Sequence, residues 1–173
     1  MTHQTTHHFP TLQRGLTLVE LMAMLLVIGV LAVVALPKYA DVQMRARVAK
    51  LKATAQSLQV VSALMRTTAT SRGADCRDAA PASLTIDGET IALVHCHPQA
   101  LGAFEQGVLA AAKLSAADGW LLSLAAGQSG SALPGATVAI EVADAPLPAS
   151  CALAYTAASR DTPPQINTRS SGC

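Results

Sequence analysis

Apolar residues fill the chain from Leu16 to Leu36, and Glu20 is the only charged residue in this stretch. At ~1.5 Å per residue, a helix over 16–36 would be about 31 Å long, close to the ~30 Å thickness of bilayer hydrocarbon. The pattern therefore predicts a transmembrane helix over 16–36, after a short polar segment over 1–15. A carboxylate in hydrocarbon costs roughly 2–3 kcal/mol or more, so Glu20 needs either a partner or a place near the headgroups.

The pattern changes after Pro37 to that of an amphipathic helix. Apolar residues recur at spacings of three and four up to about Thr67, at Met44, Val48, Leu51, Ala55, Leu58, Val61 and Met65. We therefore expect residues 37–67 to continue the transmembrane helix and to lay their apolar stripe on a sheet. The alternative is two separate helices broken at Pro37, because proline disfavours a helix interior.

Beyond residue 67 the chain is typical of short strands. The segment SLTIDGETIALV predicts a hairpin, with Asp87-Gly88 as its tight turn. Further strands are expected in WLLSLA, ATVAIEVA and CALAYTA, and an alanine-rich helix is expected between Gln99 and Leu114. A long helix followed by antiparallel strands predicts an α+β fold, in which residues 68–173 form a β-rich globular head.

Four cysteines lie in the predicted head, and none belongs to a CxxC pair: Cys76, Cys96, Cys151 and Cys173. An even number at wide spacing indicates two disulfides formed in an oxidising compartment. Four cysteines allow three connectivities, and spacing alone does not choose among them. A bridge between Cys151 and Cys173 would close a surface loop and stabilise the fold by roughly 3–4 kcal/mol.

Composition and motifs argue against several other functions. If residues 95–97 were a strand, His95 and His97 would share one face and suggest a metal site, but two imidazoles need further ligands. Exposed histidines beside a disulfide are therefore favoured, and no metal or other cofactor is expected. The chain lacks GxSxG, Walker-type and HExxH motifs, so we do not expect an enzyme. A formal net charge of +1 without a basic run argues against nucleic acid as a partner.

The stretch RGLTLVELMAMLLVIGVLAVVALP, from Arg14 to Pro37, closely resembles the amino-terminal signature of type IV pilins and pseudopilins. The matching residues are a basic residue and a glycine, an apolar residue, a run ending in glutamate, and a later glycine and proline: Arg14, Gly15, Leu16, Thr17, Leu18, Val19, Glu20, Gly29 and Pro37. The family usually has phenylalanine where this chain has Leu16.

The resemblance implies that residues 1–15 are a leader, which a prepilin peptidase removes by cutting between Gly15 and Leu16. The same enzyme would methylate the new amino terminus on Leu16. The cut would create a cationic amine, and Glu20 of one subunit would pair with the amine of a neighbour during filament assembly. The implied partners are other copies of the chain, the peptidase, and the pilus assembly machinery of the inner membrane.

The implied location is the inner membrane for the precursor, with a cytoplasmic leader and a periplasmic head, and then an extracellular pilus. The flanking charges oppose this orientation, because Arg14 alone precedes the apolar segment while five basic residues follow it: Lys38, Arg45, Arg47, Lys50 and Lys52. However, long domains translocate despite flanking charge, and the cysteines favour the oxidising side.

The region from Leu84 to Cys173 more loosely resembles pilins of the mannose-sensitive haemagglutinin type, which implies a filament used in attachment to surfaces or cells. With Cys151 joined to Cys173, this resemblance makes Cys76 and Cys96 the second disulfide. The sequence does not identify the adhesion target.

Two other interpretations stay open. A minor pilin or a type II secretion pseudopilin would share the helix but form a short or tip-located assembly. A secreted soluble domain, released by ordinary signal cleavage after Ala35, would leave Gly15 and Glu20 without a role. The favoured function is a structural subunit of a type IV pilus that polymerises through its amino-terminal helix.

Overall fold

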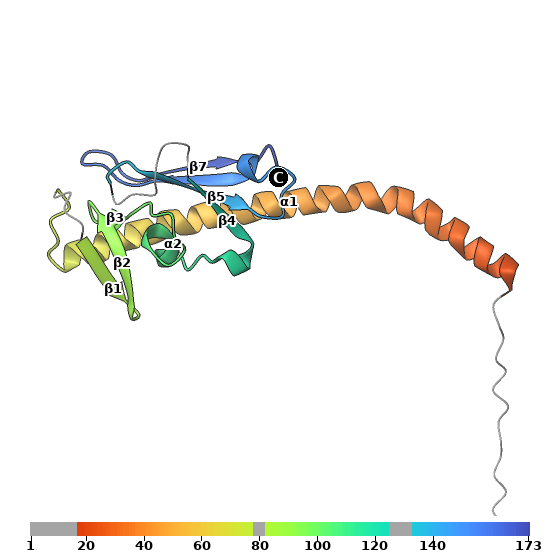
Figure 1. Cartoon of the computed structure of the whole chain (residues 1–173), viewed down its shortest axis with the longest axis horizontal. Coiled ribbons are helices and arrows are strands. Elements are labelled where there is room, and N and C mark those ends of the chain that lie inside the picture. Colours follow the sequence, from red (N-terminus) through yellow and green to blue (C-terminus); the bar gives the residue numbers. More distant parts are fainter. Residues whose placement is uncertain (1–16, 78–81, 125–132) are drawn as a thin grey trace, which may run out of the picture. The chain divides into compact units, whose positions relative to one another are not determined.

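The computed structural model describes residues 17–77, 82–124 and 133–173. The chain divides into two units, Met1–Asp41 and Val42–Cys173, and the globular head belongs to the second. Helix α1 (Leu18–Ser71) is 54 residues long and continues through Pro37, so the alternative of two helices broken at this proline is wrong (Figure 1). The predicted α+β fold, a long apolar amino-terminal helix with antiparallel sheets, is confirmed.

Helix α1 ends four residues beyond the predicted end at Thr67, because its last turn is capped. Gly73 adopts φ 82°, and its N–H donates to Thr70 O at 3.0 Å. The N–H of Ala74 donates to Ala69 O at 3.1 Å, which completes a Schellman motif. A glycine is suited to this position since it enters the left-handed region without a steric cost.

The carboxyl-terminal half of α1 buries one stripe of side chains against the head. These residues follow one another at spacings of three and four: Leu51, Thr54, Leu58, Ser62, Met65 and Ala69. The predicted amphipathic helix is therefore confirmed, although Met44 is 46% exposed and two polar residues lie within the stripe.

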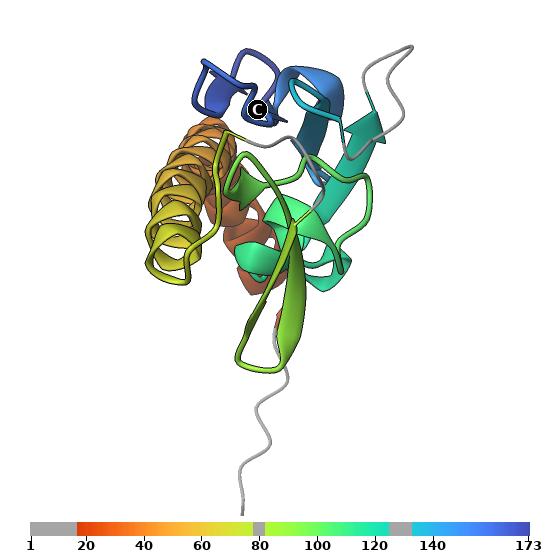
Figure 2. The same cartoon turned by 90° about the vertical axis from the view of Figure 1, so that its left-hand side faces the viewer.

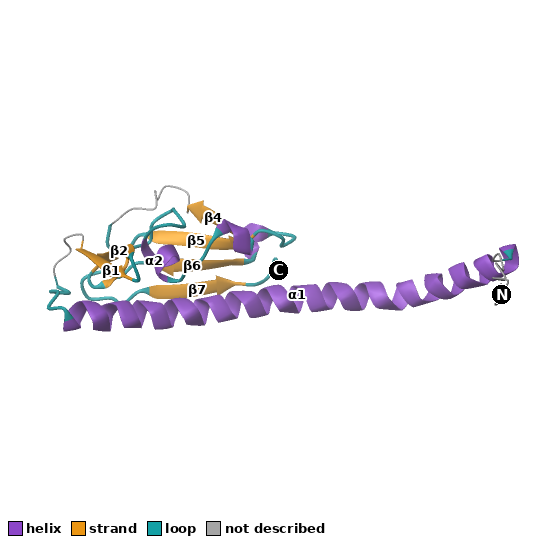
Figure 3. Cartoon of the chain, turned by 90° about the horizontal axis from the view of Figure 1, so that it is seen from below, coloured by secondary structure: helices purple, strands orange, loops and turns teal. Residues whose placement is uncertain are grey.

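Two antiparallel sheets accompany this stripe (Figure 3). The three-stranded sheet has the order β1 (Ala82–Ile86), β2 (Glu89–Val94) and β3 (His97–Pro98). The four-stranded sheet has the order β4 (Trp120–Leu124), β5 (Thr137–Val142), β6 (Ala152–Thr156) and β7 (Gln165–Arg169). In Figure 1 and in Figure 2, which turns the molecule by 90°, the green β1–β2 hairpin lies away from the blue strands β6 and β7.

Each sheet closes a hydrophobic core with α1. Leu51 and Leu58 pack with the four-stranded sheet and α2 (Gly107–Ala111), whereas Met65 and Ala69 pack with β1 and β2. The hydroxyl of Tyr155 in β6 donates a hydrogen bond to Pro98 O in β3 at 2.8 Å. This buried bond links the two sheets.

The hairpin turn is confirmed, because Asp87 and Gly88 both have positive φ between paired Ile86 and Glu89. The helix expected over residues 99–114 is reduced to α2, with the three-residue helix η1 (Ala116–Asp118) after it. The reason is that Val108 N–H donates to Gln99 O at 2.9 Å, so the chain must reverse direction between these two residues.

The segment between Cys151 and Cys173 also differs from the expected surface loop. Besides the predicted strand β6, this segment contains β7, which pairs along its whole length with β6. A three-residue helix, η2 (Pro148–Ser150), precedes Cys151. The terminal segment is therefore part of the sheet.

Gly107 should tolerate alanine much less well than Gly88. Both have positive φ, but a Cβ at Gly107 would lie 2.3 Å from Gln99 O, whereas a Cβ at Gly88 would meet nothing within 4 Å. We expect Gly107→Ala to lower the free energy of unfolding by about 2–4 kcal/mol, and Gly88→Ala by about 1–2 kcal/mol. Urea unfolding of the full chain in detergent, followed by the fluorescence of its single tryptophan, Trp120, would measure both; equal losses would contradict the packing argument.

Candidate functional site

The amino-terminal part of α1 presents apolar side chains that nothing in the described chain covers. The large apolar side chains between Leu18 and Leu36 range from 49% exposed at Met24 to 76% at Val19. Within the described residues, α1 is the one helix long and apolar enough to cross a membrane. A continuous apolar surface of this kind is stable only in lipid or against other protein surfaces.

Glu20 lies in the first turn of α1 and is exposed. Its backbone N–H donates a hydrogen bond to Thr17 Oγ1 at 3.3 Å, so Thr17 caps the amino terminus of the helix. A carboxylate in the first turn is also favoured by the helix dipole. The role of Thr17 was missed from the sequence, although a threonine three residues before a glutamate is the signal for a capping box.

The predicted processing site lies outside the described residues. Gly15 and Leu16, where cleavage and methylation are expected, both belong to the segment 1–16, as does Arg14. Their roles stay predictions, together with the ion pair of Glu20.

The structure brings Cys151 and Cys173 together in a disulfide that closes the end of the four-stranded sheet. Arg47 of α1 fastens the same end, because its Nη1 donates to Cys173 O at 3.0 Å and its Nε to Asp144 Oδ2 at 3.2 Å. Gly172 N–H adds a hydrogen bond to Ser150 O at 3.0 Å. The terminal segment is therefore held by the helix as well as by the disulfide.

The other disulfide joins Cys76, just after α1, to Cys96 in the turn between β2 and β3. His95 and Cys96 have φ 49° and 62°, and they form a two-residue turn between the paired residues Val94 and His97. The strand geometry that would put His95 and His97 on one face is therefore not the one that residues 95–97 adopt. Because His95 lies in this turn and His97 begins β3, the two histidines are not on one face of a continuous strand.

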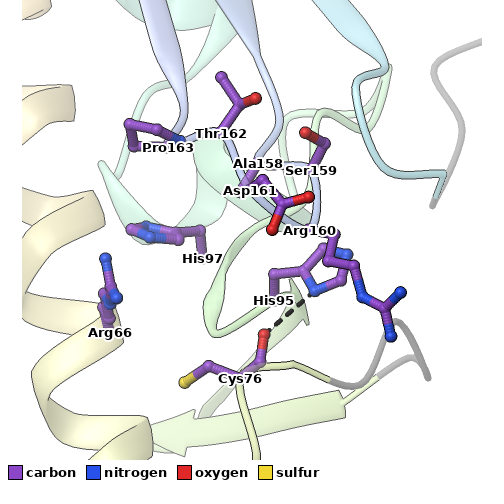
Figure 4. A pocket seen from close by; sticks show the side chains of 10 residues that line it. All are labelled: Arg66, Cys76, His95, His97, Ala158, Ser159, Arg160, Asp161, Thr162 and Pro163. Carbon is purple, nitrogen blue, oxygen red and sulfur yellow. Dashed lines mark hydrogen bonds between the residues drawn. The ribbon is translucent and has the colours of Figure 1, made fainter.

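Both histidines are buried, which corrects the expectation of exposed imidazoles. His95 and His97 are each 7% exposed. His95 Nδ1 lies 3.1 Å from Cys76 O, and a dashed line marks this hydrogen bond in Figure 4. His97 Nδ1 lies 2.9 Å from Ser62 Oγ. Among the described residues no group of three or more His, Cys, Asp or Glu side chains is placed to hold a metal ion.

The surroundings of His97 and Tyr155 disfavour a charge on either of these two side chains. Burial lowers the pKa of His97 below its ordinary value of 6.5; the charges of Arg66 and His95 lower it further, and the hydrogen bond with Ser62 opposes them. Burial also raises the pKa of the Tyr155 hydroxyl, against the opposing effect of Ser62. His97 is therefore neutral at pH 7.

The N-terminal region of the chain is similar to type IV major pilins. Over 40 residues it is 52% identical to the type IV major pilin protein PilE1 of Neisseria gonorrhoeae and to the fimbrial protein of Neisseria meningitidis serogroup B. The match covers 23% of this chain and 24% of each relative, so it spans about a quarter of their length. No protein-family model and no solved structure matches the chain.

The comparisons therefore support a pilin-like amino-terminal region and leave the head to be interpreted from its own structure. The resemblance of residues 84–173 to pilins of the mannose-sensitive haemagglutinin type stays a prediction.

His97 should make the head less stable in weak acid. Below about pH 6.5 an unfolded histidine gains a proton. The folded His97 does not, because its pKa is lowered by burial and by Arg66. The unfolded state then binds more protons, so the free energy of unfolding falls as the pH drops from 6.5 towards the lowered pKa.

We expect His97→Gln to show a shallower loss of stability than the wild type between about pH 7.5 and about pH 5.5. Urea unfolding at several pH values would measure the difference. Identical pH profiles for the two proteins would show that His97 is not responsible.

Proposed function

We propose that this chain is a structural subunit of a type IV pilus and polymerises through its amino-terminal helix. The observation that carries the proposal is the 52% identity of its N-terminal region to type IV major pilins. The exposed apolar side chains of α1 support it, because a subunit needs one surface that serves first in lipid and then against neighbouring subunits.

Maturation follows from the signature around Gly15. We infer that a prepilin peptidase cuts between Gly15 and Leu16 and methylates the amine of Leu16. The precursor is an inner-membrane protein with a cytoplasmic leader and a periplasmic head, and the assembly machinery then extracts it into an extracellular filament. The two disulfides of the head support an oxidising location on the carboxyl-terminal side.

Glu20 directs assembly in this proposal. Its carboxylate and the methylated amine of Leu16 in a neighbouring subunit are both costly in hydrocarbon, and pairing them offsets that cost in one register of the filament. The same carboxylate stands in the first turn of α1, where the helix dipole favours it before assembly.

The head supplies the outer surface of the filament and the contacts for attachment, and the chain acts without catalysis or a cofactor. A second candidate is a minor pilin or a type II secretion pseudopilin. One observation favours it: the similarity to major pilins is limited to 23% of the chain, in the region where a shared amino-terminal helix is expected.

The variants Glu20→Ala and Glu20→Gln distinguish a role of Glu20 in an ion pair from a role in capping the helix. Glutamine keeps the side chain that a capping box can use but has no charge, whereas alanine loses both. We expect both variants to reach the membrane and to abolish or strongly reduce filament incorporation. Incorporation would be measured as the ratio of sheared to membrane-bound protein; normal filaments from Glu20→Gln would contradict the ion pair.

Mass spectrometry of sheared filaments and of the inner-membrane fraction tests the proposed function directly. We expect an abundant sheared species that begins at N-methyl-Leu16 and contains two disulfides, and an uncut precursor from Gly15→Val. The same terminus found in the membrane fraction alone would favour the minor pilin or pseudopilin. A mature terminus at Leu36 would overturn the pilin proposal.

A further inference from the structure

A pocket of about 200 Å³ lies in the head where three segments meet. The end of α1 supplies Arg66, the β2–β3 turn and β3 supply His95 and His97, and the β6–β7 connection supplies residues 158–163 (Figure 4). The pocket is smaller than the roughly 300–1,000 Å³ of sites that hold drug-sized ligands. It therefore suits a small polar molecule.

Opposite sides of this pocket carry opposite charges. In Figure 4, Arg66 and His97 lie on the side of α1, whereas Asp161 and His95 lie on the other side. Arg160 also lines the pocket, but its side chain extends away from Arg66 and from the Asp161 carboxylate. The space between the two sides is therefore bordered by one guanidinium and one carboxylate.

We propose that this pocket binds a small zwitterion, with its acidic group at Arg66 and its ammonium group at Asp161. Free α-amino acids and the headgroups of zwitterionic lipids share this chemistry. A simple anion would meet the carboxylate of Asp161 as well as Arg66, and a simple cation would meet Arg66 as well as Asp161. A molecule with both charges pairs with both groups. The inference concerns the head alone and does not depend on the pilus assignment.

The two charged groups are available for a ligand. In the part of the chain that the structure describes, neither Arg66 nor Asp161 forms a side-chain hydrogen bond or ion pair, with each other or with another residue. Arg47, by contrast, already holds Asp144, with its Nε 3.2 Å from Oδ2. A guanidinium forms paired hydrogen bonds with a carboxylate or phosphate, and an ammonium group forms charge-assisted hydrogen bonds with a carboxylate.

The side that holds Asp161 offers further hydrogen-bond acceptors. His95 Nδ1 lies 3.1 Å from Cys76 O, which can only accept, so Nδ1 carries the proton and Nε2 is an acceptor in the neutral form of the ring. Within the described residues nothing bonds to this Nε2, and no buried side-chain nitrogen or oxygen lacks a partner, so Nε2 reaches solvent. The hydroxyls of Ser159 and Thr162 also border the pocket. An ammonium group has three N–H donors, which match several acceptors on one side.

The turn that carries Asp161 is held before any ligand arrives. Ser159 N–H donates to Thr162 O at 3.0 Å, and Thr162 N–H donates to Ser159 O at 3.3 Å. Arg160 and Asp161 are the two residues between them, and their side chains point in different directions in Figure 4. A disulfide also holds the β2–β3 turn to the end of α1. A site held in this way loses little conformational entropy on binding.

Ala158 and Pro163 add apolar surface to the lining, so L-alanine, with its short apolar side chain, is a suitable probe. The test is a titration of the full chain in a non-ionic detergent with L-alanine, measured by calorimetry. L-alaninamide keeps the ammonium group alone, and N-acetyl-L-alanine keeps the carboxylate alone. We expect saturable binding of L-alanine and binding of either analogue that is weaker by about tenfold or more, because each analogue loses one charge-assisted contact.

Variants of the two charged residues test the orientation of the ligand. We expect Arg66→Gln and Asp161→Asn each to weaken the binding of L-alanine by about tenfold or more. Arg66→Gln should leave the weaker binding of L-alaninamide unchanged, since that molecule has no carboxylate. Arg160→Gln is the matched control, because this arginine precedes Asp161 in the same turn but extends away from the proposed ligand. Urea unfolding would verify that all three variants stay folded.

A titration with glycerophosphoethanolamine distinguishes the two sources of the zwitterion. Tighter binding than that of L-alanine would indicate a lipid headgroup, weaker binding would indicate a free amino acid, and equal affinities would indicate a site that accepts both. The proposal is overturned if neither zwitterion binds saturably or if an analogue with one charge binds as tightly as L-alanine. It is also overturned if Arg160→Gln weakens binding as much as Arg66→Gln does.

Discussion

Both hydrophobic cores of the head are built on one stripe of α1. Leu51 and Leu58 enter the core under the four-stranded sheet, and Met65 and Ala69 enter the core under the β1–β2 hairpin. Each large side chain of this kind contributes about 1.5–3 kcal/mol on full burial. Because one face of α1 packs against both sheets, buried residues must recur every three or four positions from Leu51 to Ala69. The two sheets pack at successive positions along this face.

Polar contacts then fasten the parts that hydrophobic packing leaves free. Ser62 lies inside the stripe and meets His97, and Tyr155 reaches from one sheet to Pro98 in the other. Among the described residues, no buried side-chain nitrogen or oxygen lacks a hydrogen-bond partner. Burial of these polar groups is tolerated because each forms a hydrogen bond. The two disulfides add covalent links, from the end of α1 to the β2–β3 turn and from Cys151 to the carboxyl-terminal Cys173.

The two halves of α1 face different physical requirements. The half within the head buries its apolar face in the same chain, whereas the residues from Leu18 to Leu36 keep theirs exposed. This contrast supports the proposal that the exposed apolar surface of α1 lies first in lipid and then against neighbouring subunits. Thr17 adds a detail to that picture, since it caps the helix that carries Glu20 and does so within the chain itself.

Local patterns in the sequence determined the elements that depend on near neighbours. The apolar segment, the amphipathic stripe and the Asp87-Gly88 hairpin could all be predicted, because a periodicity or a turn residue specifies each of them. Gly73 also signals the end of the helix. The resemblance around Gly15 and Glu20 supplied the candidate processing and assembly residues, and the described structure contains Glu20 but neither residue of the cut.

Tertiary structure alone decided the features that join distant segments. Strand β7 is largely exposed at a sheet edge, with one partly buried apolar residue in Ile166, so it carries no hydrophobic alternation to detect. The turn at His95 depends on a disulfide to Cys76, 20 residues away in sequence. The pocket is lined by Arg66 of α1 and by residues 158–163 of the β6–β7 connection, and no local pattern relates these segments. These features exist because folding brings α1, the turn and the β6–β7 connection together, which a one-dimensional pattern does not contain.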